Sequence, residues 1–287
     1  MIGAIEAGGT KMVCAVSDAE LNIKARTRIS TENPQDTMRE ILAFFSEYEL
    51  SGLGVGAFGP IGVNPQRADY GFIGQTPKEG WSGFDLLGAL QTEIKCPIYL
   101  TTDVNVAAYG ELKRGSAQGL QNAVYLTVGT GIGGGIIHDG AIYVGDTHPE
   151  LGHIMVKRAQ DELEGFTGVC PYHKGCLEGM ASGPSLGARA GVKANTLAPD
   201  DPLWDIEADY LAQAAMNYTL SFAPQRIIFG GGVSNQGQLF PKLRTRFGEY
   251  LNHYVQVPDY DEYLVHAALG DDAGITGALL LAAKVAE

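Results

Sequence analysis

The sequence predicts an α/β protein made of two similarly organised halves. Glycine accounts for 39 of the 287 residues, about twice its average usage. These glycines cluster between apolar runs, which is typical of tight turns and of close approach between a backbone and a ligand. Each half opens with a strand, a glycine turn and a second strand, and then alternates strands with helices. This alternation is the pattern of α/β folds.

The first half has clear signals for its elements. We expect strands over residues 2–5, 11–16, 53–58 and 98–101, and helices over residues 33–47 and after Asp103. The first helix is the best marked, because Asn33 can cap it and Pro34 suits its first position. An apolar stripe at helical spacing runs along it through Met38, Ile41, Leu42 and Phe45.

The pattern restarts in the second half, after Gly115 and Gly119. We expect strands over residues 123–128, 135–138 and 226–229, helices over 206–222, 238–252 and 273–285, and an irregular connection over 192–205. A boundary near 116–120 divides the chain into two domains. The N-terminal domain is 1–117, which the C-terminal helix 273–287 would join, and the C-terminal domain is 118–272.

Composition and charge narrow the classes of function. The formal net charge of −13 makes the chain a poor candidate for binding nucleic acid or an anionic membrane. No apolar run reaches the roughly 18 residues of a membrane span. Glu6 interrupts any apolar segment of a signal peptide. With four cysteines and no secretion signal, we expect a reducing cytoplasm.

Residues 150–178 predict a metal site. Cys170, His173 and Cys176 follow a Cys-x2-His-x2-Cys spacing, and His153 supplies a fourth ligand for a tetrahedral zinc ion. A disulfide is one alternative, although it would close a very short loop. Inert buried thiols are another, since free cysteine is often buried. The spacing is uncommon by chance, which favours zinc.

Three glycine-rich loops are candidates for binding phosphate or nucleotide through backbone N–H groups. For each the alternative is a plain tight turn. The second is neither a Walker A loop nor a dinucleotide fingerprint, because His138-Asp139-Gly140 predicts a hairpin turn after it. In the first loop Glu6 could hold the water shell of Mg²⁺. The candidate residues are Glu6, Gly8, Gly9, Thr10, Lys11, Gly129, Thr130, Gly131, Gly133, Gly230, Gly231 and Gly232.

Three carboxylates are candidates for chemistry or for sugar binding. Asp103 follows an apolar strand, where ligands bind in α/β proteins, and it could accept a proton from an attacking hydroxyl. The alternative is that Asp103 caps the next helix. Glu150 and Glu178 bracket the zinc ligands and could accept hydrogen bonds from sugar hydroxyls, or they could be ordinary exposed acidic residues.

Taken in order, these motifs resemble the ROK family of repressors and sugar kinases, and within it the zinc-containing fructokinase branch. The resemblance covers essentially the whole chain. Its motifs are Glu6-Ala7-Gly8-Gly9-Thr10-Lys11, Phe58-Gly59-Pro60, Thr76-Pro77-Lys78-Glu79-Gly80-Trp81, Thr102-Asp103-Val104-Asn105, Glu150-Leu151-Gly152-His153, Cys170-Pro171-Tyr172-His173, Gly230-Gly231-Gly232 and Leu269-Gly270-Asp271-Asp272-Ala273-Gly274. Glu6 stands where many members have Asp, and Thr102 where glucokinases tend to have Asn.

The resemblance implies an actin-like, hexokinase-type fold with two RNase H-like domains around a cleft and a small zinc-binding insertion. It implies ATP on the glycine loops, Mg²⁺ between the phosphates and Glu6, and Asp103 as the base for the 6-hydroxyl of D-fructose. Zinc would be bound by His153, Cys170, His173 and Cys176. The sugar contacts would be Gly59, Pro60, Glu150, His153 and Glu178, with Asn105 either touching sugar or orienting the loop.

The same resemblance implies a cytoplasmic homodimer. Two other functions stay open. The first is a kinase for another hexose, such as mannose, glucose or N-acetylmannosamine. The second is a sugar-sensing repressor, which the net charge of −13 disfavours.

Overall fold

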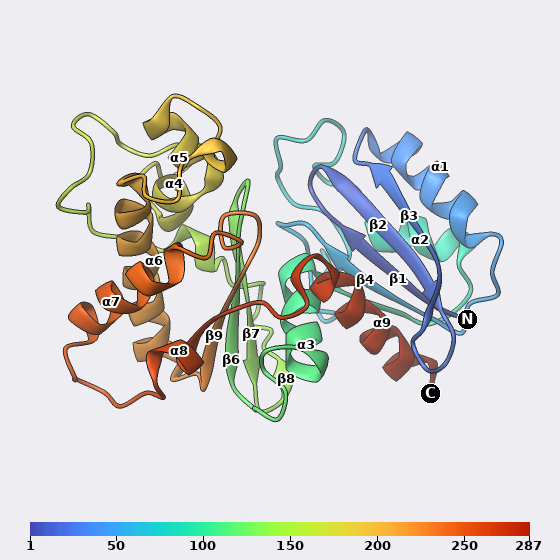
Figure 1. The fold of residues 1–287 in the computed structure, drawn as a ribbon. Helices are drawn as coiled ribbons and strands as arrows, with labels where there is room; N and C mark the ends of the chain where they lie inside the picture. Colours follow the sequence, from blue (N-terminus) through green and yellow to red (C-terminus); the bar gives the residue numbers. More distant parts are fainter. The chain divides into compact units, whose positions relative to one another are not determined.

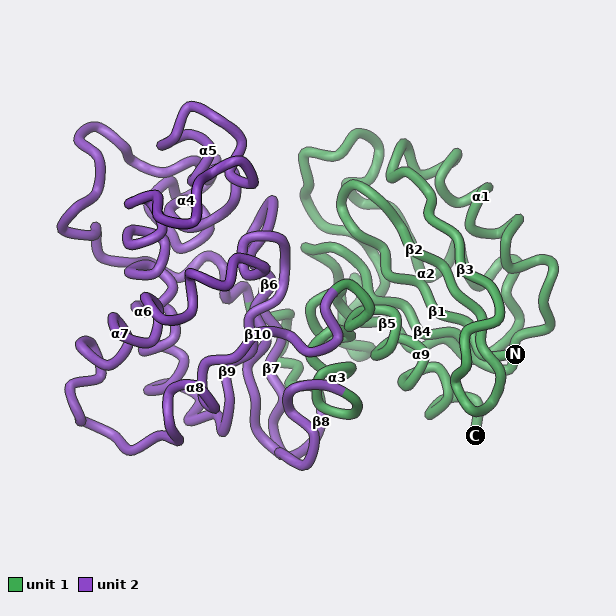
Figure 2. Tube along the Cα trace, viewed as in Figure 1, with its two compact units in different colours: residues 1–114, 142–149, 271–287 green, residues 115–141, 150–270 purple.

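The computed structural model describes residues 1–287, and their contacts divide the chain into two compact units (Figure 2). Unit 1 comprises residues 1–114, 142–149 and 271–287, and unit 2 comprises residues 115–141 and 150–270. These units are defined by contacts, not by independent folding, so the domain boundary near 116–120 stays a prediction.

Unit 1 contains a five-stranded sheet. Its order is β3 (Ile23–Ser30), β2 (Lys11–Ser17), β1 (Ile2–Ala7), β4 (Gly52–Ala57) and β5 (Ile98–Thr102). The strands β1, β2 and β3 pair antiparallel, whereas β4 and β5 run parallel to β1. Because β1, β4 and β5 are parallel, their carboxyl ends meet at one edge of the sheet, and the residues after them are brought together there.

Helices cover both faces of this sheet (Figure 1). Ile5 and Ala7 of β1 pack in one core with α1 (Pro34–Phe45) and α2 (Leu86–Glu93). Ile2 and Ala4, which alternate with them, pack in another core with α3 (Asp103–Arg114) and α9 (Ala273–Ala286). The two-residue period of a strand therefore explains how one short apolar run serves both cores.

Alternate glycines of β4 let α3 and α9 lie directly against the sheet. A Cβ atom at Gly54 would lie 2.0 Å from the carbonyl oxygen of Ala278 in α9. A Cβ atom at Gly56 would lie 2.2 Å from Cγ2 of Val106 and 3.2 Å from Cα of Asp103 in α3. Gly56 thus fixes how closely the first turn of α3, and with it Asp103, approaches the sheet.

Unit 2 contains a second five-stranded sheet with the same internal order as the first. Its order is β10 (Leu264–His266), β9 (Arg226–Gly230), β6 (Ala123–Val128), β7 (Ile132–His138) and β8 (Ala141–Ile142). The first two strands, β6 and β7, form the hairpin, and β9 pairs parallel to β6. The hairpin turn expected after His138 is present, with positive φ at Asp139 (49°) and Gly140 (74°).

Helices pack on the sheet of unit 2 around one apolar core. The central helix is α6 (Leu203–Phe222), whose Trp204, Tyr210 and Tyr218 are buried. The other helical segments are η1 (Leu151–His153), α4 (Leu177–Ala181), α5 (Gly183–Ala190), η2 (Ala194–Thr196), α7 (Leu239–Leu251) and α8 (Tyr260–Tyr263), with η3 (Gly270–Asp272) leading into α9. No helix in the structure has the length and apolar character to cross a membrane.

Several elements differ from the sequence predictions. Strand β7 begins at Ile132 and not at Gly135, so Gly133 and Gly134 pair with β6 in the sheet and are not part of a loop. Helix α6 begins at Leu203, inside the connection expected to be irregular. Seven elements were not predicted: β3, β8, β10, α2, α4, α5 and α8. Strand β3 is an edge strand with a polar face, and the other six are short.

Candidate active site

The first glycine loop joins β1 to β2 in unit 1. The N–H of Gly8 donates to the carbonyl of Lys11 at 3.0 Å, which closes the turn. The N–H groups of Gly9 and Thr10 have no acceptor within the protein. Two successive donors of this kind suit an anion. Thr10 and Lys11 are exposed beside them.

Glu6 lies under this loop, at the first turn of α9. A Cβ atom at Gly274 would lie 2.6 Å from Cδ of Glu6, so only glycine there leaves room for the carboxylate. Burial raises the pKa of Glu6, and Lys11 and Arg26 oppose that shift. Asp271 and Asp272 lie close enough to raise the pKa further. This group of carboxylate oxygens has the donor chemistry that Mg²⁺ prefers.

Asp103 is the first residue of α3, directly after β5. One carboxylate oxygen accepts the N–H of Val104 at 2.9 Å. The capping contact three residues ahead is made by Thr102 instead, whose hydroxyl accepts the N–H of Asn105 at 3.2 Å. The helix therefore has its cap in Thr102, which weakens the alternative that Asp103 is present as a cap.

Asn105 and the Gly59–Pro60 turn occupy different positions in unit 1. Asn105 is 1% exposed, and its amide donates to the hydroxyl of Thr101 at 2.9 Å. That contact fits the orienting alternative for Asn105. Gly59 and Pro60 are exposed after β4, joined by a cis peptide bond, and the carbonyl of Pro60 accepts the N–H of Gly74 at 2.7 Å.

In unit 2 a cavity of about 910 Å³ opens beside the loop between β6 and β7. Gly129 and Thr130 line it, together with Gly232 from the loop after β9. The loop after β9 also contributes Val233 and Gln236. The remaining wall comes from α5, the connection after it and the start of α6, through Gly183, Pro184, Gly187, Ala188, Gly191, Val192, Lys193, Ala194, Asn195 and Trp204. The volume and the small side chains suit a flat nucleoside.

The other glycines named from the sequence have different surroundings. Gly133 pairs with Thr127 inside the sheet, so it is a strand residue and not part of the turn. Gly230 ends β9, and a Cβ atom there would lie 2.3 Å from the hydroxyl of Tyr125. Gly231 has a φ of 83°, which favours glycine. Gly131 lies against Glu178, whose carboxylate accepts the N–H of Ile132 at 3.0 Å.

The four predicted metal ligands come together in unit 2. The ligand atoms of His153, Cys170, His173 and Cys176 all lie within 4.8 Å of one another. Nδ1 of His153 is 3.5 Å from Sγ of Cys176 and 3.8 Å from Sγ of Cys170. Nδ1 of His173 is 4.0 Å from Sγ of Cys170. Around tetrahedral zinc, nitrogen and sulfur ligands are about 3.6 Å apart, so the set fits that ion.

The backbone holds this loop without help from a disulfide, since all four cysteines are free. The N–H of Lys174 donates to the carbonyl of Cys170 at 3.0 Å, and the N–H of Val169 to Gly179 at 2.9 Å. A Cβ atom at Gly179 would lie 1.6 Å from the carbonyl oxygen of Lys174. The turn between the two cysteines is therefore packed directly onto α4, the helix that carries Glu178.

Glu150 and Glu178 lie at the two ends of this loop. Desolvation raises the pKa of Glu150, His153 lowers it, and the negative charge of Glu178 raises it. Because His153 and Glu178 both act on the pKa of Glu150, the three side chains lie near one another in unit 2. The arrangement can offer carboxylate acceptors to a polar ligand. Which hydroxyls they bind stays a prediction.

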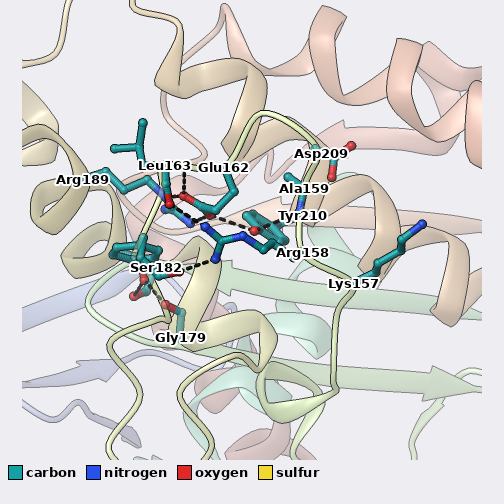
Figure 3. A network of polar contacts seen from close by, with 12 residues as sticks. Lys157, Arg158, Ala159, Glu162, Leu163, Gly179, Ser182, Arg189, Asp209 and Tyr210 are labelled. Carbon is teal, nitrogen blue, oxygen red and sulfur yellow. Dashed lines mark hydrogen bonds and ion pairs between the residues drawn. The ribbon is translucent and has the colours of Figure 1, made fainter.

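A buried polar network, which no sequence pattern indicates, supports the loop that leads to Cys170 (Figure 3). Arg189 of α5 donates to both carboxylate oxygens of Glu162, at 2.9 and 2.6 Å. Tyr210 of α6 donates to Glu162 at 2.8 Å and accepts the N–H of Ala159 at 3.1 Å. The guanidinium of Arg189 also lies 4.1 Å from the ring centroid of Phe166.

No local pattern marks these partners, because Glu162, Arg189 and Tyr210 are far apart in sequence. The cavity wall was missed for a different reason. Ser182-Gly183-Pro184 is a recognisable helix start, with Pro at an early helical position. That signal could have located α5, but not its proximity to Gly129.

Comparison with known proteins identifies relatives along the whole chain. Residues 2–285 match the ROK family. The chain is 48% identical to a fructokinase of Pediococcus pentosaceus, over 98% of this chain and 97% of the relative. It is 46% identical to a fructokinase of Lactococcus lactis subsp. cremoris, over 89% and 87%. A ROK family glucokinase from Streptomyces griseus, solved in complex with glucose and AMPPNP, superimposes with a TM-score of 0.77 at 25% identity, over 99% of each chain.

Proposed function

The chain belongs to the ROK family, and we propose that it is a fructokinase, which transfers the terminal phosphoryl group of ATP to the 6-hydroxyl of D-fructose. The observation that carries this assignment is the 48% identity to a fructokinase over nearly the full length of both chains. The family resemblance drawn from the motifs is thereby confirmed, as is the actin-like fold with its two sheets of matching strand order.

The roles that we propose for the residues rest on the family resemblance and on the surroundings of each residue. Asp103 accepts the proton of the 6-hydroxyl, and the oxygen attacks the γ-phosphorus of ATP. The bond between that phosphorus and the β,γ-bridging oxygen breaks, and ADP leaves. The N–H groups of Gly9 and Thr10 bind phosphate oxygens in unit 1. The cavity beside Gly129 and Thr130 holds the nucleoside in unit 2.

Two metal ions belong to this proposal. Glu6 would hold Mg²⁺ through its water shell, and the ion would supply positive charge against the phosphates. His153, Cys170, His173 and Cys176 would hold zinc, whose ligand distances their atoms already match. Bound there, zinc would stabilise the segment that carries Glu150, His153 and Glu178. We propose these three residues as sugar contacts, along with Gly59 and Pro60.

Asn105 is assigned a different role from the sugar contacts. Its buried amide holds Thr101, so we propose that it orients the end of β5 and the start of α3. We also propose a cytoplasmic homodimer, on the family resemblance. Sedimentation of the purified chain tests the dimer, and a monomer at micromolar concentration would contradict it.

The experiment is ADP release from MgATP with fructose, mannose, glucose and N-acetylmannosamine offered singly. Fast release with fructose and little with the others is the expected result. Faster ADP release with another sugar would support a sugar kinase whose substrate is that sugar and not fructose. No ADP release with any of the sugars, in zinc-loaded and folded protein, would favour a sugar sensor over an enzyme.

A further inference from the structure

A lysine of unit 1 lies directly on the first glycine loop. The ammonium of Lys78 donates a hydrogen bond to the carbonyl of Gly9. A Cβ atom at Gly9 would lie 2.8 Å from Cε and 3.1 Å from Nζ of Lys78. The missing side chain of Gly9 is therefore what lets Lys78 reach the backbone of the loop.

The turn that carries Lys78 is anchored firmly. The carbonyl of Lys78 accepts the N–H of Trp81 at 3.2 Å, and the buried indole of Trp81 donates to the carbonyl of Glu32 at 2.6 Å. The ring of Trp81 packs edge-on against Phe58, with centroids 5.4 Å apart. The ammonium of Lys78 lies 5.7 Å from the centroid of the same Phe58 ring. The position of this cation is set by a packed aromatic cluster.

The charge of Lys78 is not neutralised by the protein. No carboxylate forms an ion pair with it, and its contacts are a backbone carbonyl and an aromatic face. It lies beside Gly9 and Thr10, whose N–H groups have no acceptor within the protein. A half-buried cation next to two unused donors is an arrangement for an anion with several oxygens.

We propose that Lys78 is a catalytic residue of the phosphoryl transfer, and that its ammonium binds the γ-phosphoryl group of ATP on the Gly8–Thr10 loop. The inference rests on the proposed function. In the transition state, negative charge is spread over the three equatorial oxygens of the transferred group. A fixed ammonium stabilises that charge in the transition state. It gives no such stabilisation to bound ADP, because ADP lacks the γ-phosphoryl group.

The test compares binding of ADP with binding of the non-hydrolysable analogue AMPPNP, each with Mg²⁺, by isothermal titration. The variants are Lys78→Met, Lys78→Arg and the neighbouring exposed Glu79→Gln as a matched control. Lys78→Met should weaken the affinity for AMPPNP by about tenfold to a hundredfold, because one charge-assisted hydrogen bond is lost. The affinity for ADP should stay within about twofold of the wild type. Lys78→Arg should retain most of the affinity, and Glu79→Gln should match the wild type.

Turnover gives a second readout. Lys78→Met should lower kcat with fructose while leaving the KM for fructose and the unfolding midpoint near those of the wild type. A raised KM for fructose with unchanged AMPPNP affinity would overturn the proposal, because Lys78 would then contact the sugar. Equal losses of affinity for ADP and for AMPPNP would also overturn the proposal.

The outcome for Lys78 is separable from the outcome for the proposed function. If the γ-phosphate preference depends on Lys78 while no sugar supports turnover, the assignment of Lys78 to the γ-phosphoryl group stands, and its catalytic role falls with the fructokinase assignment. If the wild type binds neither nucleotide, both fall.

Discussion

Arg189 and Glu162 form a two-point ion pair from which solvent is fully excluded, with both side chains 0% exposed. The pair joins α5, which lines the proposed nucleoside cavity, to the segment that leads to the candidate metal ligand Cys170. One buried contact therefore connects the supports of two different ligand sites within unit 2.

Replacing Arg189 by Met should destabilise the protein by about 3 kcal/mol, because it leaves the Glu162 carboxylate buried without its partner. Urea unfolding followed by circular dichroism measures the change. The control is Glu164→Gln, an exposed residue of the same segment. A loss no larger than that of the control would show that the pair does not stabilise the fold.

The same pair predicts how stability depends on pH. Burial raises the pKa of Glu162, but hydrogen bonds from Arg189 and Tyr210 outweigh it, so the folded pKa lies below the ordinary value of about 4.3. The stabilisation is complete above that ordinary value and is lost as the pH falls through the folded pKa. Glu162→Gln should therefore lose less stability than the wild type on acidification from pH 5. Parallel curves for the two proteins would contradict this.

Removal of the metal should loosen the segment from residue 150 to residue 178. Cys170→Ser should lower bound zinc from about one ion per chain, measured by elemental analysis, and raise hydrogen exchange in that segment. Cys96→Ser is the control, since Cys96 is a free thiol outside the cluster. A wild-type protein without zinc after purification in zinc-containing buffer would refute the site.

Asp103→Asn should lower kcat with fructose by about 10²-fold to 10⁴-fold, the usual contribution of a positioned general base. Affinity for MgATP and the unfolding midpoint should change little, because Thr102 rather than Asp103 caps α3. Initial rates and isothermal titration measure the two effects. Turnover close to that of the wild type would remove Asp103 as the base.

Ala188→Phe should place a ring in the proposed nucleoside cavity, which Ala188 lines from α5. The KM for ATP should rise by about tenfold or more, equivalent to about 1.4 kcal/mol of binding, with kcat at saturation nearly unchanged. Ala43→Phe, at an exposed position on α1, is the matched control. An unchanged KM for ATP would place the nucleoside elsewhere.

Much of the fold could be predicted from local signals. Strand β6 and helix α1 have the periodicities and caps that the sequence displays, and their observed bounds differ little from the expected ones. Strand β3 alternates Ile23, Ala25, Thr27 and Ile29 with Lys24, Arg26 and Arg28, a strand pattern that its charges conceal. The four candidate metal ligands could be named from the sequence because three of them are close together and chemically distinctive, and the structure brings all four together.

The contacts that were missed connect residues distant in sequence. Lys78 is 69 positions from Gly9, and Arg189 is 27 from Glu162. Neither pair leaves a periodic or local signature, because each is created by packing between elements. Gly133 and Gly134 of β7 were misassigned for the opposite reason. A run of glycine predicts a loop, while their actual role is to pair in the sheet across from β6.

Helix α9 completes a core that begins with Ile2 and Ala4 of β1. In the order of synthesis, every residue of unit 2 is added to the chain before α9. On the ribosome, one face of the first sheet therefore lacks α9 until after all strands of the second sheet have been synthesised. The core that α9 shares with β1 and α3 can therefore be completed only after all of unit 2 has been added to the chain.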